Sequence, residues 1–345
     1  MKKTGRLELI WYLIIKRRKG LIFYILRLFS FFYYIVQILI NFLYSKKIFK
    51  SKRNKNCFVI SVGNITVGGT GKTPLVEYLS KYMTELGKKT AIASRGYGSK
   101  YENDKRIRIV TNGKELLMKQ IEAGDEPYML ALKLKKVPII LNKNRFKAIN
   151  SAVSMFDTEV IILDDAFQRR DIHKDLEILV FDGTTNINNF SMFPSGILRL
   201  PAQSISRADI CIINKVKNSQ SAQKIFEYIR KYDNSIPIFF SDYNFSSFHQ
   251  LNNDMPINLD TIKNKEITIF AGIGNISKFD DMIKSELAPA SINLIKFPDH
   301  YQYTPSDIKR ILMFCNISDY VITTHKDAVK LKNKAEFPNN FLYSI

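Results

Sequence analysis

From residue 58 onward, short apolar runs alternate with segments whose apolar residues recur at helical spacing. The runs that we predict as strands are residues 58–62, 90–94, 137–141, 160–163, 176–181, 210–213, 236–240, 267–271, 292–295 and 320–323. The predicted helices are residues 73–86, 127–135, 145–155, 220–232, 277–287 and 304–315. Several of the strand runs are apolar at every position, as expected when both faces of a sheet are covered. The alternation therefore predicts an α/β fold with a mostly parallel sheet.

The first 55 residues follow a different pattern. A mostly apolar stretch (7–15) precedes a basic cluster (16–19), and a second basic cluster (46–55) follows a long apolar and aromatic run (21–44). Arg27, Ser30, Gln37 and Asn41 interrupt that run. The uncharged part, 28–44, has 17 residues, which is the lower limit for a bilayer span, and the whole run is long enough if Arg27 extends to the interface.

Charge is concentrated in this N-terminal segment. The chain of 345 residues has a net charge of +20, of which residues 1–55 contribute +13. Basic flanks on both sides favour a helix or a helical pair that dips into the cytoplasmic leaflet and is also held by anionic lipids. A single span and a buried helix of a soluble domain are the alternatives. Because the cations bracket an apolar run, they indicate lipid rather than nucleic acid, and no nucleic-acid partner is expected.

The three cysteines, Cys57, Cys211 and Cys315, match no metal-binding spacing. Two of them lie in predicted strands and Cys315 ends a predicted helix. We expect all three to be core thiols in a reducing compartment.

A glycine-rich turn joins the first predicted strand of this alternating region to its helix. It contains Gly68, Gly69, Thr70, Gly71, Lys72 and Thr73. Such a turn presents backbone N–H groups and a helix N-terminus to a phosphate, Lys72 adds a cation, and the Thr73 hydroxyl can bind a nucleotide-bound Mg²⁺. Thr66 stands where the P-loop pattern has a further glycine. The motif predicts a P-loop fold that binds a nucleoside triphosphate.

Two pairs of acidic residues follow. Asp164 and Asp165 end a predicted strand, where an acid can organise Mg²⁺ behind a P-loop, although a solvated strand end has the same pattern. Asp125 and Glu126 lie between Gly124 and Pro127. One of them can cap the following helix or act as a general base toward a hydroxyl, and the local sequence leaves both roles open.

The remaining polar motifs are weaker. Arg95 and Tyr97 lie in a glycine-containing turn after the second strand, Arg199 follows a turn-rich segment, and His300 follows an apolar run. Asn214-Lys215 is only part of a guanine-reading motif, because Lys217 stands where that motif has Asp.

These motifs suggest a division of the chain. We predict a membrane-associating segment (1–55), a P-loop lobe (56–245), a polar linker or loop (246–264) and a smaller C-terminal α/β lobe (265–345).

Taken together, the motifs resemble one family, the tetraacyldisaccharide 4′-kinases of Gram-negative bacteria. The resemblance covers essentially the whole chain. The matching segments are an N-terminal membrane helix, Gly63-Asn64 with Gly68 to Pro74, Ser94-Arg95-Gly96-Tyr97-Gly98, Gly124-Asp125-Glu126-Pro127, Asp164-Asp165-Ala166-Phe167-Gln168, Pro194-x-Gly196-x-Leu198-Arg199, Asp299-His300 and Thr324-x-Lys326-Asp327-Ala328-Val329-Lys330.

The resemblance implies transfer of a phosphoryl group from ATP, with Mg²⁺, to the 4′-hydroxyl of a tetraacylated glucosamine disaccharide 1-phosphate. It implies a location at the inner (cytoplasmic) membrane with the catalytic part on the cytoplasmic face, and no protein partner. The implied roles are catalytic base (Asp125), partner of the base (His300), ligand of the transferred phosphoryl group (Lys72), metal ligands (Thr73, Asp164, Asp165) and groups lining the site (Arg95, Tyr97, Glu126, Gln168, Arg199).

Three positions depart from the family pattern. Leu200 stands where the family commonly has Glu, Arg169 where it often has His, and Ala166 where Gly is frequent. Loss of an acid at position 200 bears on the completeness of the metal shell. Two alternatives therefore stay open: a P-loop GTPase or ATPase of another class, and a membrane protein that binds nucleotide without catalysis.

Overall fold

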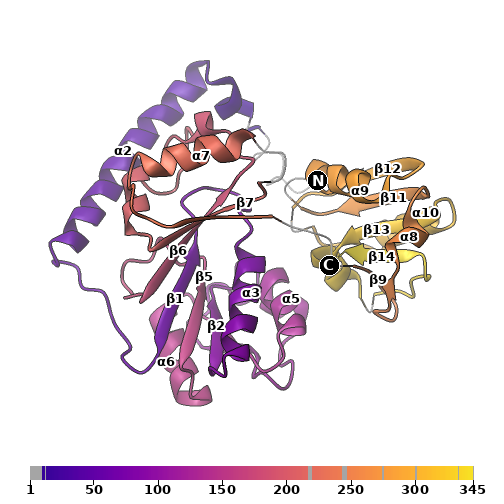
Figure 1. The fold of residues 1–345 in the computed structure, drawn as a ribbon, viewed down its shortest axis with the longest axis horizontal. Coiled ribbons are helices and arrows are strands. Elements are labelled where there is room, and N and C mark those ends of the chain that lie inside the picture. The colour runs from indigo at the N-terminus through magenta and orange to yellow at the C-terminus, as the bar shows by residue number, and fades with distance from the viewer. Residues whose placement is uncertain are drawn as a thin grey trace. The chain divides into compact units, whose positions relative to one another are not determined.

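The chain divides into two compact units, Lys2–Tyr243 and Asn244–Ile345 (Figure 1). The computed structural model describes residues 10–11, 13–216, 220–242, 247–273, 276–299, 301–332 and 334–344.

The larger unit is built on a mostly parallel sheet. Among its described residues, eight strands lie in the order β3-β4-β2-β5-β1-β6-β7-β8. Their bounds are β1 (Phe58–Gly63), β2 (Thr90–Ser94), β3 (Arg108–Thr111), β4 (Ile139–Leu141), β5 (Val160–Asp164), β6 (Leu176–Asp182), β7 (Ile210–Asn214) and β8 (Ile238–Ser241). Neighbours pair in parallel except β3 and β4, which are antiparallel. The predicted α/β fold with a mostly parallel sheet is confirmed.

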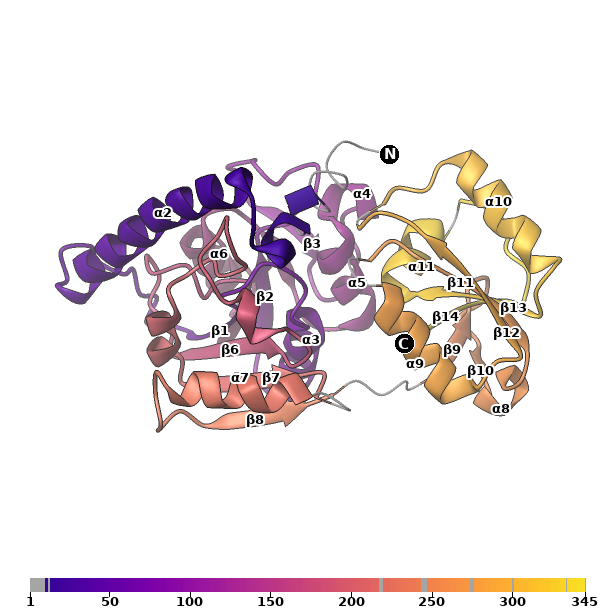
Figure 2. The same ribbon diagram turned by 90° about the horizontal axis from the view of Figure 1, so that it is seen from above.

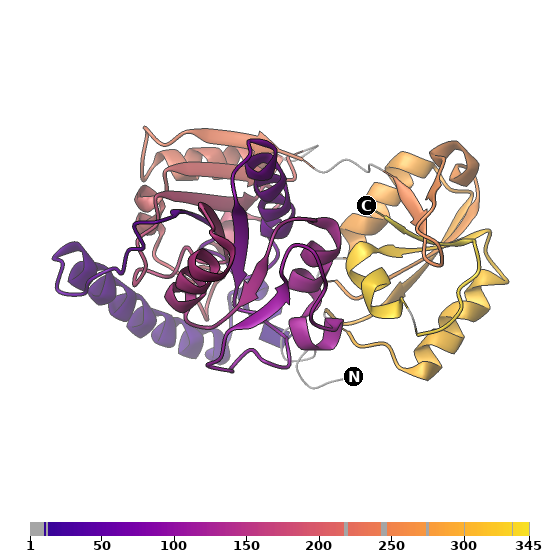
Figure 3. The ribbon, with the colours of Figure 1, turned by 90° about the horizontal axis from the view of Figure 1, so that it is seen from below.

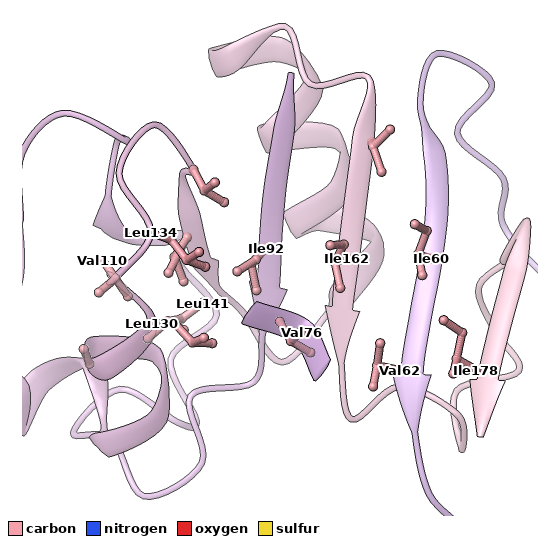
Figure 4. Close-up of a cluster of buried hydrophobic side chains, with 14 of the residues drawn as sticks. Ile60, Val62, Val76, Ile92, Val110, Leu130, Leu134, Leu141, Ile162 and Ile178 are labelled. Carbon is pink, nitrogen blue, oxygen red and sulfur yellow. The ribbon is translucent and has the colours of Figure 1, made fainter. Parts of the chain in front are cut away.

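Helices cover both faces of this sheet, which explains why its central strands are apolar at successive positions. Ile60 and Val62 of β1 pack with α3 (Lys72–Glu85) and α5 (Asp125–Lys133) on one face (Figure 4). Val59 lies on the opposite face and packs with α6 (Arg145–Phe156). Helix α7 (Gln220–Arg230) covers β6 and β7 on that same second face. The other helical elements of the unit are α4 (Gln120–Ala123), η1 (Ile187–Asn189) and η2 (Ala202–Arg207).

Cys57 and Cys211 lie in hydrophobic clusters of the larger unit, and Cys315 lies in one of the smaller unit. Cys57, Cys211 and Cys315 are buried and free of disulfides. Burial raises the pKa of the Cys57 and Cys315 thiols to about 11 and that of Cys211 to about 12. They are core thiols, as predicted from their positions in apolar runs.

The N-terminal apolar run forms one long helix, α2 (Leu21–Ser45), along the outside of the larger unit (Figures 2 and 3). By length and composition, this helix is suited to crossing a membrane. Its exposed large apolar side chains are Leu21, Ile22, Tyr24, Ile25, Leu28, Phe29, Phe31, Phe32, Ile35, Val36, Ile38, Leu39 and Phe42. Part of the predicted apolar stretch 7–15 lies outside the described residues.

Polar side chains that interrupt the apolar run hold α2 to the larger unit. Ser30 Oγ donates to Met192 O and Ser195 Oγ, both at 2.9 Å. Tyr33 donates from its hydroxyl to Arg199 O at 2.8 Å. Asn41 Oδ1 accepts from Arg170 Nη1 at 2.8 Å. These bonds span three turns of the helix, so α2 is docked along its length.

The smaller unit has its own sheet, in the order β10-β9-β14-β13-β11-β12 among its described residues. The strands are β9 (Phe248–Gln250), β10 (Pro256–Ile257), β11 (Glu266–Ala271), β12 (Ser291–Lys296), β13 (Tyr320–Thr324) and β14 (Phe341–Ser344). The helices are α8 (Leu259–Ile262), α9 (Ile276–Leu287), α10 (Pro305–Cys315) and α11 (His325–Leu331). Strands β11 to β14 pair in parallel, whereas β9 is antiparallel to β14 and β10.

Residues 247–264, which are the described part of the segment predicted as a linker or loop, are folded and contribute strands to this sheet. They contain β9, β10 and α8, and Phe248 and Ile262 are fully buried. The prediction failed because β9 is specified by pairing with β14, about ninety residues later in the chain, and not by its own weak periodicity.

Candidate active site

The predicted phosphate loop lies at the carboxyl end of β1, between β1 and the N-terminus of α3. Gly68 and Gly71 have φ of +109° and +85°, a region that glycine adopts far more readily than other residues. Gly71 is the N-cap of α3, and no side chain caps the helix. Backbone N–H groups of the first turn are therefore available to an anion.

Thr66 replaces the first glycine of the P-loop pattern without strain. Its backbone pairs with Leu198 in an isolated antiparallel bridge, and Val67 N donates to Ile197 O at 2.7 Å. This part of the loop is extended, and extended backbone suits a β-branched residue. The position that requires glycine is Gly63, where the backbone approaches Phe167 closely. A Cβ at Gly63 would lie 2.5 Å from Phe167 Cβ.

Side chains from β7 and the residue after it brace the loop. Asn214 Nδ2 donates to Thr70 O at 2.9 Å and to Gly71 O at 3.3 Å. Lys215 Nζ donates to Gly69 O at 2.9 Å and to Asp182 Oδ2 at 2.7 Å. The Asn214-Lys215 pair, which resembles part of a guanine-reading motif, thus binds the phosphate loop itself. Sequence reasoning missed this role, although both residues directly follow the predicted strand 210–213.

Asp164 ends β5 beside β1, where Val62 and Asp164 are register partners. Its side chain is 6% exposed and accepts from Ser94 Oγ at 3.3 Å. Burial, together with the charges of Glu126 and Asp165, raises the pKa of Asp164 to about 6. Lys72 and Arg145 oppose that shift without cancelling it. The neighbouring cations therefore do not fully balance the negative charge of the ionised Asp164 carboxylate. Such an environment suits a site that binds a further cation.

Asp165 has the opposite balance of charges. Lys72 Nζ lies 3.5 Å from its Oδ1, and Arg199 binds both oxygens, through Nη2 at 3.1 Å and Nη1 at 3.3 Å. Burial would raise the pKa of Asp165, but the two cations outweigh burial and hold it below its usual value. The carboxylate is therefore ionised at neutral pH.

Arg199 is held from several sides. Besides Asp165, its Nη2 donates to Asn64 Oδ1. With its amide oxygen facing the guanidinium, Gln168 accepts from Arg199 Nε at 2.9 Å and Nη1 at 3.2 Å. The predicted site residues Lys72, Asp165, Gln168 and Arg199 thus form one polar cluster beside the phosphate loop. Asn64 is an addition that its position in the same loop could have indicated.

Leu200 does not project a polar group toward this cluster. It is buried with Ile65 and Leu198 in a hydrophobic cluster, and Ala166 is also fully buried. The residues that replace Glu and Gly of the family pattern are thus accommodated by packing.

Asp125 is the first residue of α5, and it is not the cap of that helix. The N-cap is Gly124, with φ +86°, where a Cβ would lie 3.1 Å from Tyr97 O. The capping interpretation of Asp125 or Glu126 is therefore wrong, because the tight approach of the Tyr97 turn requires glycine at the cap. Asp125 is 6% exposed and accepts from Gln120 Nε2 at 2.5 Å. The charge of Glu126 acts on Asp164, so this helix start faces the same cluster.

The other predicted residues are less closely integrated. Arg95 Nε pairs with Glu102 at 3.2 Å, and Tyr97 is 71% exposed. His300 lies outside the described residues, so its pairing with Asp125 stays a prediction.

Arg145 is a site residue that sequence reasoning missed. It is 5% exposed, donating from Nη1 to Asn142 O at 2.7 Å and from Nη2 to Asp164 O at 3.3 Å. Burial lowers the pKa of its guanidinium to about 10, although Asp164 opposes the shift. Arg145 opens α6 directly after the end of β4, at the same sheet edge as Asp164, and that position was the available signal.

The residues predicted as metal ligands offer oxygen donors: the Thr73 hydroxyl and the carboxylates of Asp164 and Asp165. In the described part of the chain, no group of three or more His, Cys, Asp or Glu side chains could hold a metal ion. Hard oxygen donors, few in number and next to a phosphate loop, fit Mg²⁺, which keeps water and nucleotide phosphate among its ligands.

Comparison with known proteins places this chain among proteins of one family. The family model described as tetraacyldisaccharide-1-P 4′-kinase matches residues 22–344. A tetraacyldisaccharide 4′-kinase from Desulfatibacillum aliphaticivorans is 39% identical over 324 residues, covering 90% of this chain and 84% of the relative. One from Syntrophus aciditrophicus is 33% identical over 330 residues, covering 92% and 87%. The crystal structure of LpxK from Aquifex aeolicus in complex with ATP matches with a TM-score of 0.72 and 30% identity, covering 92% and 91% of the two chains.

Proposed function

Because this chain belongs to the tetraacyldisaccharide 4′-kinase family, we propose that the cluster at the carboxyl ends of β1 and β5 is its catalytic centre. The chain is a lipid kinase that uses ATP to phosphorylate the 4′-hydroxyl of tetraacyldisaccharide 1-phosphate in lipid A biosynthesis. The observation that carries the assignment of the centre is the contact of Lys72 and Arg199 with Asp165 beside the phosphate loop. Membership of this family excludes the two alternatives, which were a P-loop GTPase or ATPase of another class and a membrane protein that binds nucleotide without catalysis.

The phosphate loop positions the nucleotide in this proposal. Gly68, Gly69, Thr70 and Gly71 supply backbone N–H groups to the phosphates, and Lys72 contacts the phosphoryl group that is transferred. Asp165 keeps the ammonium of Lys72 and the guanidinium of Arg199 in place. Phosphoryl transfer depends mainly on positioning and charge neutralisation, and these groups provide both.

Thr73, Asp164 and Asp165 would hold the Mg²⁺ of the nucleotide. When bound, the ion would neutralise charge on the phosphates. The ion would also add positive charge beside Asp164, whose pKa is raised by burial and by the charges of Glu126 and Asp165. Leu200 stands where the family commonly has an acid, so Asp164 and Asp165 are the carboxylates that this proposal assigns to the ion.

Asp125 accepts the proton of the attacking 4′-hydroxyl. The Gln120 amide donates to one oxygen of this carboxylate, at the start of α5. His300 is proposed as the partner of this base, and Arg95, Tyr97, Glu126 and Gln168 line the substrate side of the site.

Transfer of label from γ-labelled ATP to purified tetraacyldisaccharide 1-phosphate in detergent micelles tests the proposed centre. We expect label at the 4′-position that depends on Mg²⁺ and persists with Leu200 in place. Transfer that is equally fast in excess chelator would contradict the metal assignment to Thr73, Asp164 and Asp165.

The N-terminal helix associates the enzyme with the membrane. We infer that α2 lies in the cytoplasmic leaflet of the inner membrane and does not cross it. Ser30, Tyr33 and Asn41 bind α2 to the catalytic unit along its length. If α2 crossed the membrane, the catalytic unit bound to it would be drawn into the hydrocarbon, where burial of charged and polar groups costs free energy. A helix that lies in the leaflet avoids this cost. The basic clusters 16–19 and 46–55 would bind anionic headgroups.

Replacement of two exposed α2 residues should weaken binding to the membrane. For Phe32→Glu with Leu39→Glu, we expect partition into vesicles that contain anionic lipid to fall more than about tenfold, because two apolar side chains lose their burial. Tyr78→Glu with Tyr82→Glu, on the exposed face of α3, is the matched control and should leave partition unchanged. Equal partition of both variants, measured by vesicle sedimentation, would refute the interfacial placement.

A further inference from the structure

A cavity with a cationic lining opens beside the catalytic cluster in the larger unit. Its volume is about 420 Å³, and its lining includes Lys105, Lys143, Lys147 and Arg169. Lys143 precedes the first turn of α6 and Lys147 lies within it, so the helix N-terminus adds a positive field to that of the side chains. We refer to this cavity as the cationic pocket.

The positive charge of the cationic pocket is not neutralised by its own carboxylate. Asp104 also lines it, but Asp104 is bound by Arg106 at 3.2 Å and by Arg108 at 2.5 Å. Arg169 bonds to Asp171 at 2.8 Å and 2.7 Å. Within the described ranges, no ion pair involves Lys105, Lys143 or Lys147. Three ammonium groups therefore face a volume large enough for a phosphate ester.

The cationic pocket lies near both Asp164, a proposed metal ligand, and helix α2. Arg145 bonds to the backbone oxygen of Asn142, a residue of the pocket wall, and to that of Asp164. The guanidinium of Arg145 thus bridges the wall of the cationic pocket and the catalytic cluster. On the other side, Arg170 follows Arg169 directly and bonds to Asn41 of α2. An acceptor anchored by acyl chains near α2 would place its sugar headgroup over this region.

We propose that the cationic pocket binds the 1-phosphate of the lipid acceptor while the 4′-hydroxyl lies at Asp125. This inference rests on the proposed function. The acceptor carries one phosphate, at the opposite end of the disaccharide from the reacting hydroxyl. A phosphate monoester has up to two negative charges and three acceptor oxygens, which several cations bind well. Recognition at that end selects 1-phosphorylated disaccharides and orients the 4′-hydroxyl toward the base.

Arg169 gives this pocket a feature of its own in this chain. Where the family often has His, Arg169 supplies a guanidinium group. Two of its nitrogens, Nε and Nη2, bind Asp171, so Arg169 adds further N–H donors to the pocket wall more than unpaired charge.

The test compares two acceptors in detergent micelles with the full-length protein: tetraacyldisaccharide 1-phosphate and the same disaccharide with a free 1-hydroxyl. In the variant Lys143→Gln with Lys147→Gln, we expect KM for the 1-phosphate acceptor to rise about tenfold or more. KM for the 1-hydroxyl acceptor and KM for ATP should stay unchanged. The second variant, Arg169→Gln, should shift the same preference in the same direction.

Lys114→Gln with Lys224→Gln, two exposed lysines elsewhere in the larger unit, is the control and should behave like the unaltered protein. An equal rise in KM for both acceptors, or a rise in KM for ATP, would overturn the proposal. Reduced binding to anionic vesicles with unchanged acceptor preference would assign the pocket to a lipid headgroup and also overturn it. The proposed function fails separately, if the unaltered protein labels neither acceptor.

Discussion

Replacement of Asp125 by Asn is expected to lower kcat by a factor of about 10² to 10⁴, the usual contribution of a positioned general base. The amide has nearly the volume of the carboxylate and can still accept from Gln120, but it cannot take the proton of the 4′-hydroxyl. ATP binding should persist, because the phosphate loop belongs to a different part of the chain, between β1 and α3. Steady-state transfer and nucleotide titration of the same preparation separate the two properties.

Asp157→Asn provides the control for this substitution. Asp157 is an exposed aspartate at the C-terminal end of α6, with φ +49°, a conformation that Asn tolerates well. Its variant should retain the turnover of the unaltered protein. If Asp125→Asn kept more than about half of the turnover, a group other than Asp125 would have to accept the proton, since loss of a base costs at least about 10²-fold.

Replacement of Lys72 by Ala is expected to lower kcat by a factor of about 10² to 10³, the range for loss of one charged donor in a transition state. Lys72 is the first residue of α3, beside the phosphate loop, and its Nζ lies 3.5 Å from Asp165 Oδ1. Without it, the transferred phosphoryl group loses a cation, and Asp165 loses one of the two side-chain cations that contact it. Single-turnover kinetics at saturating ATP measure this loss directly.

Lys81→Ala is the matched control on the same helix. Lys81 pairs with Glu77 on the surface of α3, and exposed pairs of this kind contribute little to stability. The control should change neither kcat nor KM. A Lys72→Ala protein with normal kcat and only a weaker KM for ATP would show that Lys72 binds ground state and transition state equally.

The apolar pattern alone determined much of the fold. The central strands β1, β2 and β5 are buried at nearly every position, and their unbroken apolar runs can be read without knowing their neighbours. The helices between them carry one apolar stripe each, with the period of 3.6 residues. Both signals are local, which is why the predicted ranges agree closely with the observed ones.

Short elements could not be predicted in this way. The strands β3, β9, β10 and β14 have two to four residues each, too few for a period to be recognised. They exist because a partner strand supplies hydrogen bonds, as β14 does for β9. Pairing of distant segments is a tertiary property, so the segment 246–264 was interpreted as a linker.

The candidate site also has a part that local sequence predicts and a part that only distant contacts create. The phosphate loop and the acidic end of β5 were predictable, because strand, turn and helix follow one another in the chain and the carboxyl ends of parallel strands share one edge. The contacts of Arg199 with Asn64, Asp165 and Gln168 join three separate segments, and no local pattern indicates them. The same holds for Arg145.

The N-terminal helix shows the division most clearly. Composition by itself determined that residues 21–44 are apolar, flanked by cations and suited to a membrane. Only the tertiary structure decided that Ser30, Tyr33 and Asn41 turn toward the catalytic unit while Phe32 and Leu39 stay exposed. The physical reason is that hydrophobicity belongs to each residue and its near neighbours, whereas the partner of a polar side chain is chosen by whichever distant segment the fold brings beside it.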